Sequence, residues 1–132
     1  MTNNKGGLAM VLTRSEMEIM DVLWNAGKPM SRSDILDCSA DKSWKDSSVH
    51  ILLNGLLRKS MIQEAGFVKR SKTYGRTFLP TVSREEFFAA NAFAYKYKPS
   101  AAALVDAICR SNQLSKQELL EIREVLERHI AE

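Results

Sequence analysis

The amino-acid sequence predicts a mainly α-helical fold that contains one small β-hairpin. The first observation is that a Ser or Thr stands three residues before a Glu or Asp at several places, which is the capping-box signature of a helix start. The second is that apolar residues follow these starts at three- and four-residue spacing. The third is that only residues 61–80 change to the aromatic and β-branched character of strands.

Two helices open the predicted fold. The first begins at a capping box formed by Thr13 and Glu16, and Gly27 ends it because glycine favours the left-handed conformation found after helices. The second begins at Ser31, where the same spacing recurs, and is short, ending near Ala40. Both carry apolar residues on one side, so we expect them to share a core.

The third helix is predicted in the stretch SWKDSSVHILLNGLLRKSMI and begins close to Asp46. Its apolar positions recur at helical spacing and are expected to face the core: Val49, Leu52, Leu53, Leu56 and Leu57. The 100° step between helical residues leaves five positions on the outward side: Ser47, Ser48, His50, Ile51 and Asn54. The helix thus combines an apolar body with a start made of small polar side chains.

A hairpin and three further helices complete the predicted chain. The hairpin has the basic sequence KRSK at its tip and ends at Pro80, and a fourth helix is expected from Ser83 until Pro99 interrupts it. The segments SAAALVDAIC and SKQELLEIREVLERHIAE supply two more helices. Three helices followed by a hairpin is the order of a winged helix-turn-helix. We therefore predict three regions: a flexible N-terminus at 1–11, a winged-helix DNA-binding domain at 12–82 and a helical dimerisation region at 83–132.

Composition limits the class of protein. A hydrophobic fraction of 45% and a charged fraction of 27% are typical of soluble domains, and no apolar run approaches the roughly 18 residues of a membrane span. The start of the chain does not resemble a secretory signal, so we expect a cytoplasmic location and no membrane partner. Cys38 and Cys109 form no Cys-x-x-Cys motif, so neither a disulfide framework nor a zinc cluster is predicted.

Positive charge is concentrated in one part of the chain. Residues 42–78 contain eight lysines and arginines but only two carboxylates, Asp46 and Glu64, which gives a net charge of +6 within a protein whose net charge is +3. Such a footprint is expected of a surface that binds nucleic acid. A solvated basic face without a partner is the alternative.

The predicted third helix has the character of a DNA recognition helix. In helix-turn-helix proteins the N-terminal residues of this helix contact base edges in the major groove, and hydroxyl, imidazole, amide and methyl groups suit those edges. The predicted base-reading residues are Lys45, Ser47, Ser48, His50, Ile51 and Asn54. The basic residues expected to bind the DNA backbone, including those of the wing, are Lys42, Lys69, Arg70, Lys72 and Arg76.

Simpler explanations exist for the same residues. Ser47 and Ser48 could be only a helix cap, and His50 and Asn54 only solvated surface groups. A hairpin tip is often basic for solubility and to discourage edge pairing. Asp46 is expected to cap the third helix at a modest cost in DNA affinity, because a carboxylate repels phosphates. A winged helix that binds protein rather than DNA is the alternative function.

The C-terminal helices carry more apolar surface than they can cover on one another. The residues expected at a homodimer interface are Phe87, Leu104, Ile108, Leu119, Ile122 and Leu126. The alternative is that these helices fold back on the winged helix of the same chain. His50 and His129 have no Ser, Cys or carboxylate partner at a catalytic or metal spacing, and no glycine-rich phosphate loop is present. No enzyme activity, catalytic residue, metal or cofactor is therefore predicted.

Several of these segments resemble one family of bacterial regulators. The segments are LTRSEMEIMDVLWNAGKPMSRSDIL with Trp24, Trp44 before the third helix, VHILLNGLLRKSMI, and the C-terminal LSKQELLEIREVLE. They are similar to the BlaI/MecI/CopY family of penicillinase, methicillin-resistance and copper-transport repressors. The resemblance implies a homodimeric repressor whose winged helices bind a palindromic operator in double-stranded DNA.

The resemblance also implies site residues and inputs. By position, the family's DNA contacts fall on the wing and on Ser31, Lys45, Ser47, Ser48, Ile51 and Asn54. This chain departs from the family at Asp46, Ser47 and Asn54, and it has Ser60 where a glycine is usual after the third helix. The copper-responsive branch has clustered C-terminal cysteines, and none follows Cys109 here. The antibiotic-responsive branch implies a regulatory protease as a partner, but residues 89–100 show no recognisable cleavage bond, so the inducing signal stays open.

Overall fold

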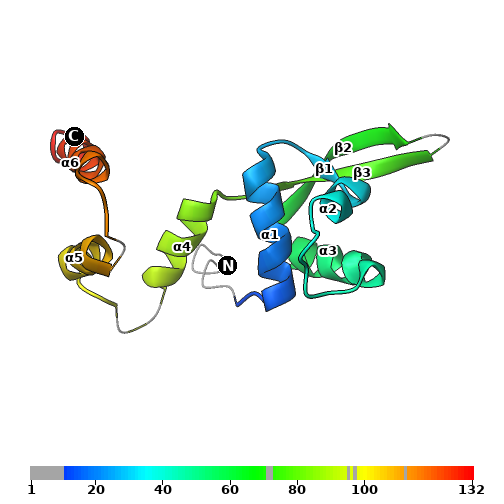
Figure 1. The fold of residues 1–132 in the computed structure, drawn as a ribbon, viewed down its shortest axis with the longest axis horizontal. Helices are drawn as coiled ribbons and strands as arrows, with labels where there is room; N and C mark the ends of the chain where they lie inside the picture. The colour runs from blue at the N-terminus through cyan, green and yellow to red at the C-terminus, as the bar shows by residue number, and fades with distance from the viewer. Residues whose placement is uncertain (1–10, 71–72, 95, 97, 112) are drawn as a thin grey trace. The chain divides into compact units, whose positions relative to one another are not determined.

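The computed structural model describes residues 11–70, 73–94, 96, 98–111 and 113–132. The chain forms two compact units, Met1–Tyr95 and Lys96–Glu132. The elements of the first unit are α1 (Arg14–Ala26), β1 (Met30–Ser31), α2 (Arg32–Asp37), the 3-10 turn η2 (Asp46–Ser48), α3 (Val49–Arg58), β2 (Ile62–Arg70), β3 (Thr73–Pro80) and α4 (Arg84–Ala92) (Figure 1). The second unit contains α5 (Ala101–Ser111) and α6 (Lys116–Ile130). The predicted fold class, mainly helical with a winged helix-turn-helix and C-terminal helices, is confirmed.

Reciprocal caps begin four of the helices, as the sequence predicts. At α1, the Glu16 N–H donates to Thr13 Oγ1 over 3.1 Å and the Thr13 N–H donates to Glu16 Oε1 over 2.9 Å. The same box begins α2 at Ser31, α4 at Ser83 and α6 at Ser115. These boxes satisfy backbone N–H groups that have no partner inside the helix.

The core of the first unit lies between its helices and the sheet. In Figure 1, α1 has α2 and α3 on one side and α4 on the other, with the β2–β3 hairpin extending beyond them. The buried apolar side chains are Ile19, Met20, Leu23, Met30, Ile35, Trp44, Val49, Leu53, Leu56, Met61, Ile62, Phe78 and Phe87. Because α3 supplies Val49, Leu53 and Leu56 to this core, one face of that helix is fixed toward the interior.

A three-stranded antiparallel sheet with the order β1–β3–β2 carries the wing. The two-residue strand β1 was not predicted from the sequence; it pairs Met30 with Phe78. Between β2 and β3 the register shifts at Ala65, because Glu64 pairs with Phe78 while Gly66 pairs with Thr77. Gly66 has a φ of 126°, which the absence of a Cβ permits. This bulge is the only register irregularity in the described strand pairings.

Helix α3 ends in a motif that usually contains a glycine, but the residue at that position here is Ser60. Ser60 has a φ of 59°, in the left-handed region, and its N–H donates to the Leu57 carbonyl over 3.0 Å. The Met61 N–H donates to the Leu56 carbonyl over 3.0 Å. This pair of bonds is a Schellman motif, in which glycine is the preferred residue at the position of Ser60.

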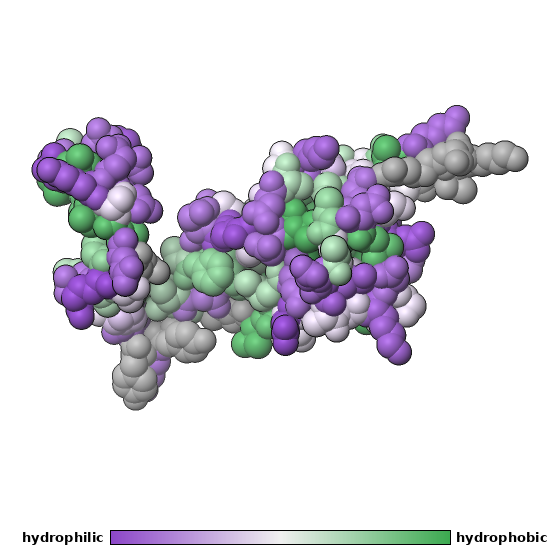
Figure 2. Space-filling model, in the orientation of Figure 1, coloured by the Kyte–Doolittle hydropathy of each residue, from purple (hydrophilic) through white to green (hydrophobic). Residues whose placement is uncertain are grey.

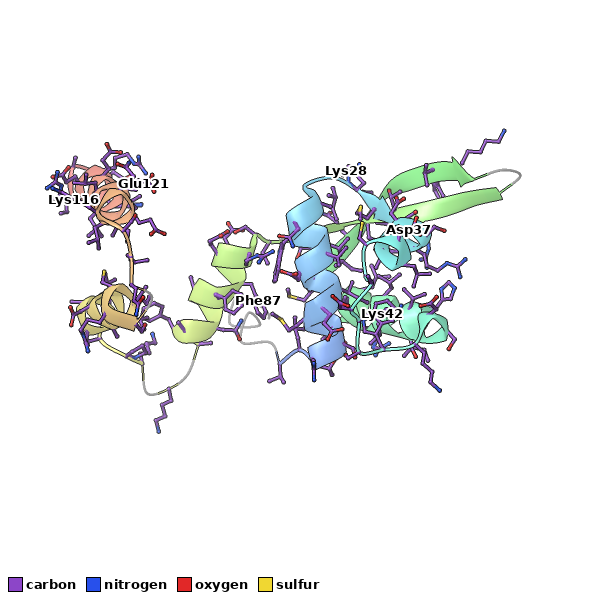
Figure 3. The ribbon with its side chains drawn as sticks, in the orientation of Figure 1. Lys28, Asp37, Lys42, Phe87, Lys116 and Glu121 are labelled. Carbon is purple, nitrogen blue, oxygen red and sulfur yellow. The ribbon has the colours of Figure 1, made fainter. Side chains whose placement is uncertain are left out.

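Helix α4 belongs to the first unit, whereas the sequence predicts that it belongs with the C-terminal helices at 83–132. The Trp24 Nε1–H donates to the Val82 carbonyl over 2.9 Å, and the Phe87 ring lies 5.8 Å from the Trp24 ring. Phe87 points from α4 toward α1 (Figure 3) and is only 7% exposed. The structure thus corrects the expectation that Phe87 is free for a dimer interface, because Trp24 of the same chain covers it. The helix also ends at Ala92, before the predicted interruption by Pro99.

The second unit has two amphipathic helices and little interior. Neither α5 nor α6 has a buried residue, and Figure 2 shows hydrophobic residues at its surface among hydrophilic ones. The exposed apolar side chains of the two helices are Val105, Ile108, Leu119, Val125, Leu126 and Ile130. In the part of the chain that is described, no helix is long and apolar enough to cross a membrane.

Candidate DNA interface

Helix α3 presents the face that the sequence predicts. Opposite its buried positions, Ser47, His50, Ile51 and Asn54 are exposed, and Ser48 is half-buried. Ile51 is 73% exposed, although the same helix supplies core residues from its other face. The structure therefore brings these five predicted residues together on one accessible strip.

The serines at the start of α3 do not cap it. Ser48 occupies the N-cap position but makes no side-chain cap hydrogen bond, and the preceding turn also lacks one. Every other helix that has a described N-cap uses a Ser or Thr hydroxyl there. Among the described residues, the hydroxyls of Ser47 and Ser48 have no hydrogen-bond partner. A cap alone thus does not account for them, and both hydroxyls are free to bond to a ligand.

Asp46 binds a lysine instead of capping the helix, which corrects the sequence expectation. Its Oδ1 lies 2.7 Å from Lys42 Nζ, and the same ammonium lies 5.4 Å from the centre of the Trp44 ring. Lys42, labelled in Figure 3, lies in the segment that leads to α3. The charge of Lys42 is therefore balanced by Asp46. Lys45, in contrast, is exposed and has no ion pair within the described part of the chain.

The side chain of Arg32 joins this surface, although the sequence did not indicate it. Arg32 is the first residue of α2, and its Nη1 lies 2.8 Å from Nε2 of His50 on α3. Both residues are exposed. The basic stretch that the sequence shows is residues 42–78, and Arg32 lies outside it. The one sequence signal that could have indicated Arg32 is that it follows Ser31, which the family resemblance marks as a DNA contact.

The wing residues differ in their availability. Lys69 is exposed and forms no ion pair with a described residue, while the guanidinium of Arg76 binds Glu64 and lies 5.3 Å from the centre of the Phe78 ring. Lys72 and the side chain of Arg70 lie outside the described part of the structure. On the described part of the wing, Lys69 therefore offers the more available charge.

Ser31 is not available as a DNA contact in this structure. It is 2% exposed, and its hydroxyl accepts from the Asp34 N–H as the cap of α2. It also pairs with Thr77 in the sheet. The predicted contact at Ser31 is corrected for this reason, since the residue is occupied in positioning α2.

A buried carboxylate connects α1 to the end of α3. Lys59 Nζ donates to Glu16 Oε1 over 2.7 Å and to the Val11 carbonyl over 3.0 Å. Burial raises the pKa of Glu16, but the hydrogen bonds from Lys59 and Thr13 and the Lys59 charge outweigh it, so the pKa is lowered overall. This contact fixes the C-terminal end of α3 against α1.

The described residues contain no group of three or more His, Cys, Asp or Glu side chains placed to hold a metal ion. Cys38 and Cys109 are free thiols. The exposed groups on and beside α3 include hydrogen-bonding, apolar and basic side chains, whose chemistry suits base edges and phosphates, and also the carboxylate of Asp46, which pairs with Lys42.

Comparisons with known proteins cover almost the whole chain. A family model described as "Penicillinase repressor" matches residues 12–128. The chain is 30% identical over 125 residues to a Latilactobacillus sakei protein named "Uncharacterized 16.5 kDa protein in ptsI 3'region", over 87% of this chain and 77% of that protein. It is 22% identical over 123 residues to the penicillinase repressor of Bacillus licheniformis, over 89% of this chain and 91% of that one. A mutant of S. aureus MepR bound to an oligodeoxyribonucleotide aligns with a TM-score of 0.47 and 14% identity, over 96% of this chain and 86% of that one. The chain therefore belongs to the penicillinase repressor family, a family of transcriptional repressors and not of enzymes.

Proposed function

We propose that this protein is a homodimeric repressor that binds a palindromic operator in double-stranded DNA through α3. The observation that supports this most directly is the exposed strip on α3, where the hydroxyls of Ser47 and Ser48 are not used as caps. A recognition helix needs such a start, since small hydrogen-bonding groups let its backbone approach base edges. Membership of a repressor family supports the same function.

The groups on this strip have separate roles in the proposal. Ser47 and Ser48 donate to or accept from bases, Asn54 suits the N6 and N7 atoms of adenine, and Ile51 suits the methyl group of thymine. Lys45 and Lys69 bind phosphates, because both are exposed and free of carboxylates among the described residues. Lys42 and Arg76 bind phosphates only after they leave Asp46 and Glu64.

Titration of a labelled promoter duplex at two salt concentrations tests DNA binding. We expect specific binding that weakens steeply with salt. The slope of log K against log salt should correspond to the release of about one counterion for each phosphate contact. Lys45→Ala and Lys69→Ala should each make the negative slope of log K against log salt shallower by about 1. Absence of binding at low salt would refute the proposal and favour a winged helix that binds protein.

A matched pair of substitutions tests the docking face. Ser48→Glu adds a bulky charge to the proposed base-reading strip and should abolish operator binding. Ser15→Glu makes the same change in the first turn of α1 and should leave binding largely intact. Equal losses in both variants would mean that net charge, rather than the position on α3, is responsible.

The second unit supports a homodimer in this proposal. A pair of helices without one buried residue does not bury enough apolar surface to be stable alone, so another surface is needed to cover them. A second copy fits, because the predicted interface residues Ile108, Leu119 and Leu126 are each about half exposed, and Leu104 and Ile122 are partly buried beside them. Two linked winged helices then bind both half-sites of a palindrome with a high effective concentration.

Sedimentation velocity with two variants of α6 tests the dimer. Leu126→Glu places a charge on the apolar face and should give monomers. Gln117→Glu adds the same charge to the polar face and should leave the dimer unchanged. If Leu126→Glu stays dimeric, the α6 face is not the interface.

A regulatory protease would act most effectively between the two units. A cut near their boundary at Tyr95 and Lys96 separates α3 from α5 and α6. Each released winged helix would then bind only one half-site and would leave the operator without any change at the DNA contacts.

We expect the protein to act in the cytoplasm, where its DNA target lies.

A further inference from the structure

The contact between Arg32 and His50 joins two helices on the proposed DNA surface. The two residues are far apart in sequence, but the first turn of α2 brings Arg32 beside the first turn of α3. Arg32 Nη1 lies 2.8 Å from His50 Nε2. Among the described residues Arg32 forms no ion pair, so its other N–H groups stay available.

The chemistry of the pair restricts what it can bind. A guanidinium only donates hydrogen bonds, so Nε2 of His50 must be the acceptor and cannot carry a proton. The proton of the neutral ring is then on Nδ1. Both side chains therefore offer donors, and neither offers an acceptor, to a molecule that approaches from outside.

The geometry points to Arg32 and His50 as one unit that selects guanine in the operator, an inference that rests on the proposed function. In the major groove guanine presents two acceptors, N7 and O6, while adenine pairs an acceptor with an amino donor and cytosine presents an amino donor. A surface that only donates matches guanine best. The role of Arg32 toward His50 is positional, because it sets which ring nitrogen donates.

Binding selection from randomised half-sites tests this inference. The wild-type protein should select guanine at one position of each half-site. Arg32→Ala and His50→Ala should each reduce that preference about tenfold or more at the same position and leave the other positions unchanged. Lys69→Ala is the control, because loss of a phosphate contact lowers affinity for all sequences alike.

Nitrogen-15 NMR of the histidine rings in mildly alkaline buffer gives an independent readout. The free wild-type protein should show His50 protonated on Nδ1, and Arg32→Ala should lose this fixed state. A uniform loss of affinity in Arg32→Ala would overturn the inference, since Arg32 would then be a phosphate contact. Effects of the two variants at different operator positions would also overturn it. If the wild-type protein selects no sequence at all, the proposed function itself fails and the inference with it.

Discussion

Gly55 is the point at which α3 approaches the buried Glu16 of α1. A Cβ at Gly55 would lie 2.8 Å from Glu16 Oε2, which is too close for a stable contact. The carboxylate cannot move aside freely, because its other oxygen accepts from the Thr13 N–H and from Lys59 Nζ. Gly55→Ala is therefore expected to displace Glu16 from the capping box.

Two opposing effects determine the sign of this substitution. Replacing glycine by alanine inside a helix stabilises it by about 1 kcal/mol. Loss of the hydrogen bond from the Thr13 N–H to Glu16 costs about 1 kcal/mol, and loss of the hydrogen bond between the charged groups of Lys59 and Glu16 costs about 1.5–3 kcal/mol. We therefore expect Gly55→Ala to lower the free energy of unfolding by about 1.5–3 kcal/mol, against the helix propensity.

Urea unfolding at a fixed protein concentration, followed by tryptophan fluorescence, measures this effect. The same substitution in a Glu16→Ala background should stabilise by about 1 kcal/mol, because no carboxylate then blocks the new methyl group. Stabilisation by Gly55→Ala alone, or an equal loss in both backgrounds, would refute the reasoning.

Three further changes have defined outcomes. Glu16 has a pKa below its ordinary value of 4.5 in the folded protein, so its contribution is present above that value and lost as the pH falls through the folded pKa. The urea midpoint of the wild type should therefore fall more steeply below about pH 4.5 than that of Glu16→Gln. Ser60→Gly should raise the free energy of unfolding by about 0.5–1 kcal/mol, because it relieves a left-handed φ. Trp24→Phe should lower the free energy of unfolding by about 1–2 kcal/mol, and with it the melting temperature, because it removes the hydrogen bond to Val82.

Each of these outcomes can fail in a recognisable way. Parallel acid transitions in the wild type and Glu16→Gln would mean that other groups dominate below pH 4.5. A neutral or destabilising Ser60→Gly would show that flexibility in the unfolded chain outweighs the relief of φ. An unchanged melting temperature in Trp24→Phe would show that ring packing, without the hydrogen bond, holds α4.

Local patterns predicted the helix starts and the outward face of α3 because both depend on residues three or four positions apart. Thr13 with Glu16 fixes a helix start through bonds within one turn, and Ile51 lies on the side of α3 opposite Leu53 by helical geometry alone. The order of three helices and a hairpin followed from the same patterns. These features need no knowledge of distant segments.

The missed features all depend on contacts between distant segments. Strand β1 has two residues and exists because β3 pairs with it, so no periodicity marks it. Phe87 looks like other apolar residues of an amphipathic helix until Trp24 covers it. Arg32 meets His50 only because the fold brings the first residue of α2 close to the first turn of α3. Ser31 is buried for a similar reason, since the sheet and the helix cap both use it.

The bulge in β2 decides what the wing displays. Side chains alternate between the two faces of a strand, and one extra residue reverses the alternation for every position beyond it. Because Ala65 is the extra residue, Phe67 pairs with Arg76 and lies on the face that carries Phe78. If the ladder continued from Glu64 without the bulge, Ala65 would pair with Thr77 and Phe67 with Gly75, so Phe67 and Lys69 would lie on the reverse face and Val68 on the face of Phe78. The bulge, as much as the basic residues of β2, therefore sets which side chains share the Phe78 face of the wing.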